Sequence, residues 1–288
     1  NVTGEIVVTI KGKGNYTGEF TDRYKITKRY VRLSSLDDGK VYDGTPLTNT
    51  VLQQDSALTF VEGEASAEVT GTITNKGSVP NTITVIKTEK YKEDNYNFDT
   101  NEGTLTITAK DVTVTANNAN KVYGEKDPEL TTTVTGTLGE DKVTYTLTRD
   151  SGEDVGTYTI HVTGDADQGN YHVTYRAGEF EITKSGELKL TAELTGESAT
   201  KVYDGTPLTG GATANVKEGT TITYSTDDGT TWTTEIPSIT NVGTLNITAK
   251  AENPNYEPAE TTYSLTVTHA TATVTAEDKT KTYGEADP

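Results

Sequence analysis

The chain has 288 residues and a formal net charge of −18, and it contains neither Cys nor Met. So acidic a surface disfavours nucleic acid and anionic lipid as partners, because both carry phosphate groups. The lack of Cys excludes disulfides, thiolate metal sites and cysteine nucleophiles, and no apolar run approaches the ~20 residues that a membrane helix needs, so we expect no membrane insertion.

One tyrosine-glycine motif recurs four times along the chain. Two copies read Lys-Val-Tyr-Asp-Gly-Thr-Pro-Leu-Thr from Lys40 and Lys201, and two read Lys-x-Tyr-Gly-Glu-x-Asp-Pro from Lys121 and Lys281. The motif tyrosines lie 81, 80 and 80 residues apart, so two kinds of segment alternate. Such a period indicates a repeat architecture. We predict a structural role for the tyrosine and glycine of each copy: Tyr42, Gly44, Tyr123, Gly124, Tyr203, Gly205, Tyr283 and Gly284.

A second motif, Asn-Tyr, follows the same period. It occurs at Asn15-Tyr16, Asn95-Tyr96, Asn170-Tyr171 and Asn255-Tyr256. Its place before the last strands of each segment resembles a tyrosine corner, in which the hydroxyl bonds to the backbone. Segments of about 80 residues bury a small core, so we expect the repeated tyrosines to anchor it.

The repeats predict the following domain organisation. Two complete segments of the first kind alternate with one complete segment of the second kind, and a partial segment of the second kind lies at each end of the sequence. The boundaries we predict are 1–28, 29–110, 111–184, 185–269 and 270–288.

Alternation of apolar and polar residues indicates half-buried strands throughout. Val112 and Val114 share one face of a predicted strand at 111–116. Residues 156–183 read as a three-strand meander of Thr157–Thr163, Tyr171–Tyr175 and Glu179–Thr183. Turn signals every 8–12 residues and no helical periodicity favour an all-β fold.

We therefore predict an all-β fold of tandem immunoglobulin-like β-sandwich modules in an elongated rod. Connections between the segments are very short, as at Lys110-Asp111 and His269-Ala270. Short connections limit bending more than long Gly/Ser tethers do. At a strand rise of about 3.3 Å per residue, three modules end to end should span on the order of 100 Å.

The two motifs resemble two families of bacterial repeats. The Val-Tyr-Asp-Gly-Thr-Pro-Leu segments resemble YDG domains, and the Tyr-Gly-Glu-x-Asp-Pro segments resemble MBG ("mostly bacterial Ig") domains. The stretch from Tyr224 to Trp232, followed by 237–244, is typical of such modules in Gram-positive gut bacteria. The segment 29–110 departs from this pattern, because it has no counterpart of the Trp232 hairpin. The resemblance implies large secreted or wall-anchored proteins in which these modules form stalks, and it implies no catalytic residues.

Candidate chemistry in the sequence is sparse. Three histidines, at 161, 172 and 269, do not have metal-ligand spacing, and no Gly-x-Ser-x-Gly motif occurs, so we expect no enzyme activity and no cofactor. Asp165, Asp167 and Asn170 place oxygen ligands in one turn, which makes them a calcium candidate against the simpler reading of a solvated turn.

Two further candidates concern binding and cross-linking. Trp232 is the only Trp and is a candidate ligand-binding residue, because exposed aromatic rings can stack on sugars; the alternative is a ring packed across its own hairpin. Lys40, Lys121 and Lys201 lie near Asp and Asn residues, so Lys–Asn or Lys–Asp isopeptide bonds are a further hypothesis.

These observations predict a non-catalytic stalk or spacer of a bacterial cell-surface adhesin-type protein, located outside the cell at the surface or in the wall. Its partners would be the neighbouring modules of the same chain. Two alternatives stay open. The modules themselves could bind host glycan or protein, or the partial segments 1–28 and 270–288 of two chains could complete one another, giving head-to-tail self-association through strand addition.

Overall fold

The computed structural model describes residues 4–194 and 199–288. Within these ranges the regular elements are β-strands, apart from one short 3-10 turn, η1 (Glu93–Asn95). The prediction of an all-β fold of tandem immunoglobulin-like β-sandwich modules is confirmed. The chain forms two units: Asn1–Asn117, Thr131–Thr148 and His161–Ala177 make the first, and Asn118–Leu130, Arg149–Ile160 and Gly178–Pro288 make the second.

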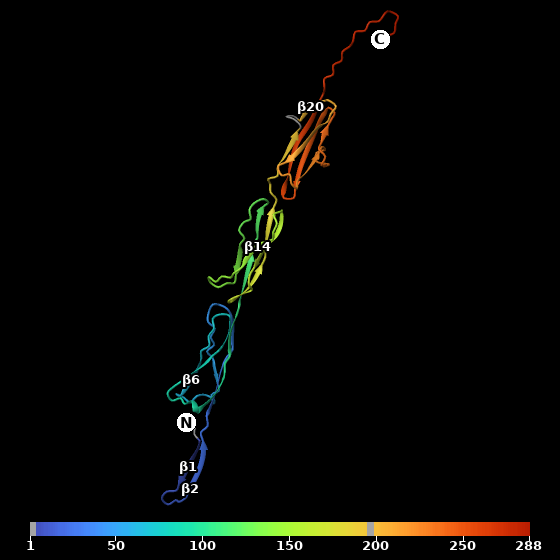
Figure 1. Cartoon of the computed structure of the whole chain (residues 1–288). Coiled ribbons are helices and arrows are strands. Elements are labelled where there is room, and N and C mark those ends of the chain that lie inside the picture. Colours follow the sequence, from blue (N-terminus) through green and yellow to red (C-terminus); the bar gives the residue numbers. More distant parts are fainter. Residues whose placement is uncertain (1–3, 195–198) are drawn as a thin grey trace. The chain divides into compact units, whose positions relative to one another are not determined.

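Among the described residues, the strands of the first unit form five sheets. Their strand orders are β1-β2, β5-β3-β9, β6-β8, β4-β10-β7 and β13-β11-β17-β16. The first two strands of the unit, β1 and β2, are blue in Figure 1. The strands are β1 (Glu5–Lys11), β2 (Glu19–Lys25), β3 (Arg29–Ser35), β4 (Asp38–Val41), β5 (Leu52–Gln54), β6 (Ala65–Val69), β7 (Gly77–Pro80), β8 (Ile83–Lys87), β9 (Tyr96–Asn101), β10 (Thr104–Thr108), β11 (Lys110–Ala116), β13 (Thr132–Thr135), β16 (Asp167–Gln168) and β17 (Tyr171–Arg176).

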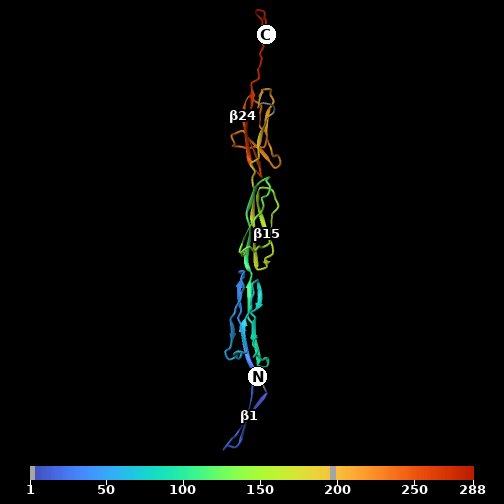
Figure 2. The same cartoon turned by 90° about the vertical axis from the view of Figure 1, so that its left-hand side faces the viewer.

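The second unit contains three sheets, of orders β12-β18-β15-β14, β19-β21-β23 and β20-β25-β24-β22. The long antiparallel pair β24–β25 is seen in orange and red in Figures 1 and 2. The strands are β12 (Ala119–Val122), β18 (Gly178–Thr183), β19 (Leu190–Leu194), β20 (Thr200–Val202), β21 (Leu208–Ala214), β22 (Thr221–Ser225), β23 (Ser238–Ile239), β24 (Gly243–Asn253) and β25 (Tyr256–Thr268). Two further strands, β14 (Thr146–Arg149) and β15 (Gly156–Thr163), contribute residues to both units.

One topology recurs in both units. An early strand pairs in parallel with a late one: β3 with β9 and β4 with β10 in the first unit, β12 with β18 and β20 with β25 in the second. In three of these pairs, β4–β10, β12–β18 and β20–β25, the tyrosine of a tyrosine-glycine motif directly follows the early strand. Parallel pairing therefore brings each motif to the end of a late strand.

The predicted alternation holds where the core forms. Val112 and Val114 of β11 are buried, as are Ile160 and Val162 of β15. In the second unit Leu208, Tyr224, Ile247, Leu265 and Val267 form one buried cluster. Thr is abundant on the opposite faces, where its β-branched side chain suits a solvated strand.

The predicted meander is wrong in its pairing, although its three strands exist. The strand β15 pairs with β18, whereas β17 lies in the other sheet, between β11 and β16. Period-two alternation identifies a strand and its buried face, but it does not identify the neighbour. Here β17 gains a six-residue parallel register with β11, which the meander would not provide.

The prediction that the repeated tyrosines anchor the core is correct for some copies of each motif and wrong for others: Tyr42 packs against a buried cluster, whereas Tyr16 is 79% exposed. Tyr96 and Tyr171 of the Asn-Tyr motif are only 4% and 5% exposed. In contrast, Tyr203 of the tyrosine-glycine motif is 43% exposed and Tyr283 is fully exposed. The motif tyrosine follows the end of a strand, and its ring is largely covered where it meets an Asn-Tyr ring, as at Tyr42 and Tyr123.

The part of the chain that the structure describes contains no helix with the length and apolar character needed to cross a membrane.

Candidate functional site

The tyrosine-glycine motif forms a loop closed by its own lysine. Lys40 Nζ donates to Asp43 Oδ1 at 2.7 Å and to Thr45 Oγ1 at 2.6 Å. In the same way, Lys201 Nζ lies 2.7 Å from Asp204 Oδ1 and 2.6 Å from Thr206 Oγ1. The lysine hydrogen bond, helped by the threonine N–H, holds the pKa of each aspartate well below its usual range.

The motif glycines take the backbone conformation that the loop requires. Gly44, Gly124, Gly205 and Gly284 have φ angles of 79°, 88°, 83° and 88°. A side chain at this φ is strained, so glycine is the residue that the turn favours. This observation gives the predicted motif glycines a physical role.

The Lys121 loop is a larger charge cluster. Lys121 Nζ donates to Asp127 Oδ1 at 2.7 Å and to Glu153, and Arg149 contacts both carboxylates at 2.6 Å. The lysine side chain is only 3% exposed. The Arg149 guanidinium also lies 4.7 Å from the centre of the Phe180 ring, a cation–π contact.

The charges of this cluster oppose the isopeptide hypothesis. The hydrogen bonds from Arg149 and Lys121 lower the pKa of Asp127 to about 2, and those to Asp127 and Glu153 raise the pKa of Lys121. Amide formation needs a neutral amine and a neutral acid, which these shifts disfavour. The arrangement favours an ion pair that organises the loop.

Arg149 and Glu153 of this cluster were not predicted from the sequence. They follow Asp127 by 22 and 26 residues and reach it only because β14 and β15 join the sheet of β12. The pattern of Lys121 and Asp127 within the motif was the available signal, and it identified half of the cluster.

The rings of the two repeated motifs meet in pairs. Tyr42 contacts Tyr171 edge-on within the first unit, with ring centres 5.7 Å apart and an interplanar angle of 89°. Within the second unit Tyr123 contacts Tyr256 at 5.3 Å and 69°. In both pairs the first tyrosine comes from the tyrosine-glycine motif and the second from the Asn-Tyr motif of the next predicted segment. Such edge contacts contribute about 0.5–1.5 kcal/mol beyond the buried area.

The hydroxyls of the buried Asn-Tyr tyrosines are hydrogen-bonded, but their partners lie far earlier in the chain than the few residues that separate the partners in a tyrosine corner, so that resemblance is wrong in its detail. Tyr171 accepts from the Leu138 N–H at 3.1 Å and donates to Asp141 at 2.5 Å. Tyr96 accepts from the Val61 N–H at 3.2 Å and donates to Glu64 at 2.6 Å. Each tyrosine thus fixes a loop about 30 residues earlier in the chain.

The turn predicted as a calcium candidate engages protein groups. The Asp167 carboxylate pairs with Lys76, and the Asn170 side chain also bonds to the loop around Lys76. The Asp165 carbonyl accepts from Gln168 and Tyr175. Among residues 4–194 and 199–288, no three His, Cys, Asp or Glu side chains gather as metal ligands would. The structure therefore brings Asp167 and Asn170 together around a lysine, and calcium binding stays a prediction.

Trp232 lies on a loop that is organised by Asp227. This carboxylate accepts from the Thr231 N–H at 2.9 Å, from Thr231 Oγ1 at 2.7 Å and from Ser225 Oγ at 2.8 Å. These hydrogen bonds lower the pKa of Asp227 to about 2, and the bond from the Thr231 N–H has the largest effect. The indole N–H of Trp232 donates to the Gly229 carbonyl at 3.1 Å, so the ring folds back over its own loop and is 40% exposed.

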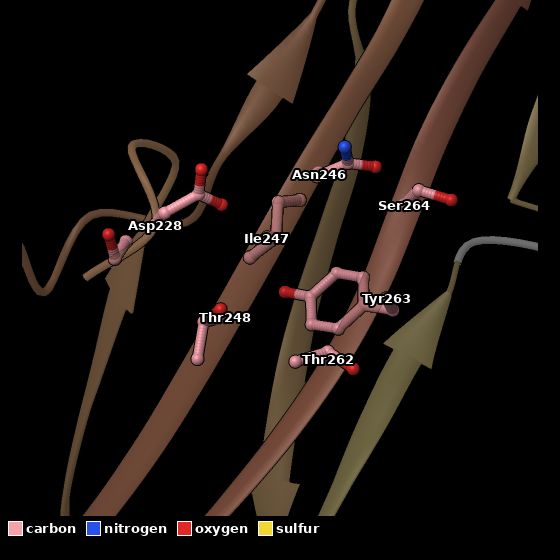
Figure 3. Close-up of a pocket in the computed structure, with 8 residues that line it drawn as sticks. Asp228, Asn246, Ile247, Thr248, Thr262, Tyr263 and Ser264 are labelled. Atoms are coloured by element: carbon pink, nitrogen blue, oxygen red, sulfur yellow. The ribbon is translucent and has the colours of Figure 1, made fainter.

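A polar pocket lies beside this loop (Figure 3). Its volume is about 370 Å³ and its lining includes Asp228, Asn246, Thr248, Thr262 and Ser264. Asp228 is the one non-glycine residue of the described chain with a positive φ, at 56°. Its carboxylate accepts no hydrogen bond from the described residues. The loop is therefore held by Asp227 while the next carboxylate stays unpaired at the pocket.

Among solved structures, similar chains include Drosophila N-cadherin EC1-4 (12% identity, 93% of this chain and 83% of that chain covered, TM-score 0.31) and protocadherin gammaB7 EC3-6 (12% identity, 92% and 84% covered, TM-score 0.32). The extracellular domains 3–5 of Drosophila OTK are 11% identical, with 84% and 97% covered and a TM-score of 0.29. A comparison with curated proteins finds no match.

The family comparison is specific to the middle of the chain. Residues 112–181 match the model of the MBG domain, YGX type. This range begins at Val112, the first buried residue of β11, and includes the Lys121 cluster. The resemblance to an MBG domain that we inferred from the Tyr-Gly-Glu-x-Asp-Pro motif is therefore confirmed for residues 112–181.

Proposed function

We propose that the chain is a non-catalytic spacer of an extracellular, adhesion-type protein on a bacterial surface. One observation carries the proposal: the rings of the repeated motifs pair at Tyr42–Tyr171 and at Tyr123–Tyr256. Residues that recur with the period of the repeat thus contact the next segment. The match of residues 112–181 to the MBG domain supports the same reading.

The proposal includes the domain organisation and the shape. Modules at 29–110, 111–184 and 185–269 follow one another in an elongated rod, flanked by the partial segments 1–28 and 270–288. The charge of −18 keeps such a rod soluble and repels it from anionic surfaces. The lysine-closed loops stiffen the ends of the modules, where the next module begins.

Small-angle X-ray scattering of the full chain tests the spacer role. A rod of three modules has a maximum dimension on the order of 100 Å or more. A compact chain of this length has a radius of gyration of about 19 Å, and that value would contradict the proposal. A dilution series in the same experiment tests head-to-tail self-association, which predicts polymers that grow with concentration.

A second candidate function, the binding of a neutral sugar, is favoured by the pocket beside Asp228. A carboxylate and an amide on short side chains, with hydroxyls around them, offer the donors and acceptors that a hydroxyl-rich ligand uses. The loop is fixed in advance by Asp227, which reduces the entropy cost of binding. The unpaired carboxylate of Asp228 disfavours an anionic ligand.

Saturation-transfer NMR with galactose, glucose and N-acetylglucosamine tests this candidate. Sugar binding predicts a signal that Asp228→Asn and Asn246→Ala both remove. Trp232→Ala shows whether the indole takes part. Glu193→Gln, which changes an exposed carboxylate on β19, is the matched control and should leave the signal intact. No signal, or one that survives both pocket variants, would eliminate the pocket as a sugar site.

A further inference from the structure

The same loop and strand arrangement occurs at three places in the chain. A short turn of the form Asn/Asp-x-Gly precedes a strand at Asn75-Lys76-Gly77, Asp154-Val155-Gly156 and Asn241-Val242-Gly243. Its glycine has a φ of 147°, 158° and 155° in the three copies. Each copy of the turn lies in a predicted segment that also carries a tyrosine-glycine motif.

Strand register places each turn beside a motif tyrosine. Gly77, Gly156 and Gly243 pair with Ile107, Ile182 and Val267 of the late strands. The next residue of each late strand accepts the N–H of the motif tyrosine. These bonds run from Tyr42 to Thr108 at 2.9 Å, from Tyr123 to Thr183 at 2.9 Å and from Tyr203 to Thr268 at 2.8 Å. We call each tyrosine and its turn a socket: Tyr42 with 75–77, Tyr123 with 154–156, and Tyr203 with 241–243.

Two of the sockets are occupied by an Asn-Tyr pair, and the asparagine makes the same two bonds in each. Asn170 Oδ1 accepts from the Lys76 N–H at 2.8 Å, and its Nδ2 donates to Asn75 Oδ1 at 3.1 Å. Asn255 Oδ1 accepts from the Val155 N–H at 2.8 Å, and its Nδ2 donates to Asp154 Oδ1 at 2.9 Å.

The asparagine side chain bonds to one backbone donor and to one side-chain acceptor. Asn suits this arrangement because its amide carries an acceptor oxygen and a donor nitrogen. Aspartate could accept from the backbone N–H but could not donate to the side chain of the turn. The Asn or Asp at the first turn position supplies the matching acceptor in both occupied sockets.

The third socket has the same residues but lacks this occupant among the described residues. Tyr203 is 43% exposed and Val242 is 42% exposed. The Val242 N–H, equivalent to those of Lys76 and Val155, has no acceptor in the part of the chain described. This socket therefore serves as an internal reference for the two that are filled.

We propose that these sockets and the Asn-Tyr pairs form a repeated docking code that fixes one immunoglobulin-like segment against the next. This inference rests on the proposed spacer role and names the residues that hold each junction. The partner that fits the open Tyr203 socket is the Asn-Tyr corner of another such segment.

Hydrogen exchange of three equivalent backbone amides tests the code in the full chain. Lys76 and Val155 should exchange slowly and Val242 fast. Asn170→Ala should speed exchange at Lys76 roughly tenfold or more and leave Val155 unchanged, and Asn255→Ala should do the reverse. Unchanged protection of the amides in β11 for Asn170→Ala, and in β24 for Asn255→Ala, shows that the fold around each substitution is intact.

Two results would overturn the code: exchange at Lys76 and Val155 as fast as at Val242, or protection that neither asparagine variant alters. An extended chain in scattering with unprotected junction amides would retain the spacer role and reject the code. A compact chain with protected amides would do the opposite, so the two proposals fail separately.

Discussion

The loops at 119–128 and 200–209 in the second unit carry the same motif in different surroundings. Both are closed by a lysine that lies 2.7 Å from an aspartate. The Lys121 side chain is 3% exposed and shares its aspartate with Arg149, whereas Lys201 is 21% exposed and bonds to Thr206 instead.

The difference follows from the position of the acidic residue. Asp204 comes three residues after its lysine, so the loop closes on itself with a threonine hydroxyl. Asp127 comes six residues after Lys121 and reaches Arg149 from the neighbouring strands. Lys281 and Asp287 repeat the second spacing and also lie 2.7 Å apart, but that lysine is 46% exposed. The motif therefore encodes the loop locally, and the sheet determines how deeply the loop is buried.

The two loops should differ most in thermal stability when their lysines, Lys121 and Lys201, are replaced. Lys121→Ala removes a buried side chain and its bonds to Asp127 and Glu153, which keep only Arg149 as a partner. This loss should destabilise the fold more than the loss of the less buried Lys201 pair. We expect its segment to melt roughly 5–10 °C lower in calorimetry, against about 2 °C for Lys201→Ala. Trp232 fluorescence reports the segment that contains Lys201, so it should respond to the second variant alone. Equal shifts would show that burial does not distinguish the two loops.

A smaller contrast is expected for the tyrosines of the same loops. Tyr123→Ala removes the edge contact with Tyr256 and should lower the free energy of unfolding by about 1–2 kcal/mol. Tyr203→Ala removes a ring that is 43% exposed, and the change in the free energy of unfolding should stay within about 0.5 kcal/mol. Urea unfolding of both variants measures the difference. A cost for Tyr203 as large as that for Tyr123 would contradict the socket assignment.

The smallest expected effect is that of Asp127 on how stability depends on pH in acid. The folded-state pKa of Asp127 is about 2, below the usual value of 3.8, so the unfolded chain binds more protons in this range. Stability from this carboxylate is therefore complete above about pH 4 and is lost as the pH falls toward 2. Melting temperatures measured across this range should fall less steeply in Asp127→Asn. An identical slope in wild type and variant would show that Asp127 does not contribute.

Much of the fold could be predicted from the sequence because it rests on local pattern. Alternation identified β11 and β15 and their buried residues, and the motif glycines, for which we predicted a structural role, have positive φ angles. Strand partners could not be predicted in this way, since alternation specifies a face and leaves the neighbour open. The meander failed for that reason, and Arg149 was missed for the same reason.

The candidate site was predicted only in part. Tyr42 and Tyr123 were identified as structural, but their contacts with Tyr171 and Tyr256 join segments far apart in the sequence. The turn at 75–77 gave a usable signal, because Asn/Asp-x-Gly recurs before a strand in each segment. Asn170 was assigned to a calcium turn because its oxygen atom fits that role, and only the structure shows that it bonds to a loop 94 residues earlier.

Distances between spin labels across each junction test the central claim most directly. The chain has no Cys, so paired cysteines at exposed positions can be labelled cleanly: Glu68 with Thr174 in the first unit, and Glu179 with Glu260 in the second. Segments held by filled sockets predict a narrow distance distribution for each pair, which broadens when Asn170 or Asn255 is replaced by Ala. Broad distributions in the unaltered chain would mean that neighbouring segments move independently and that the junctions do not hold them.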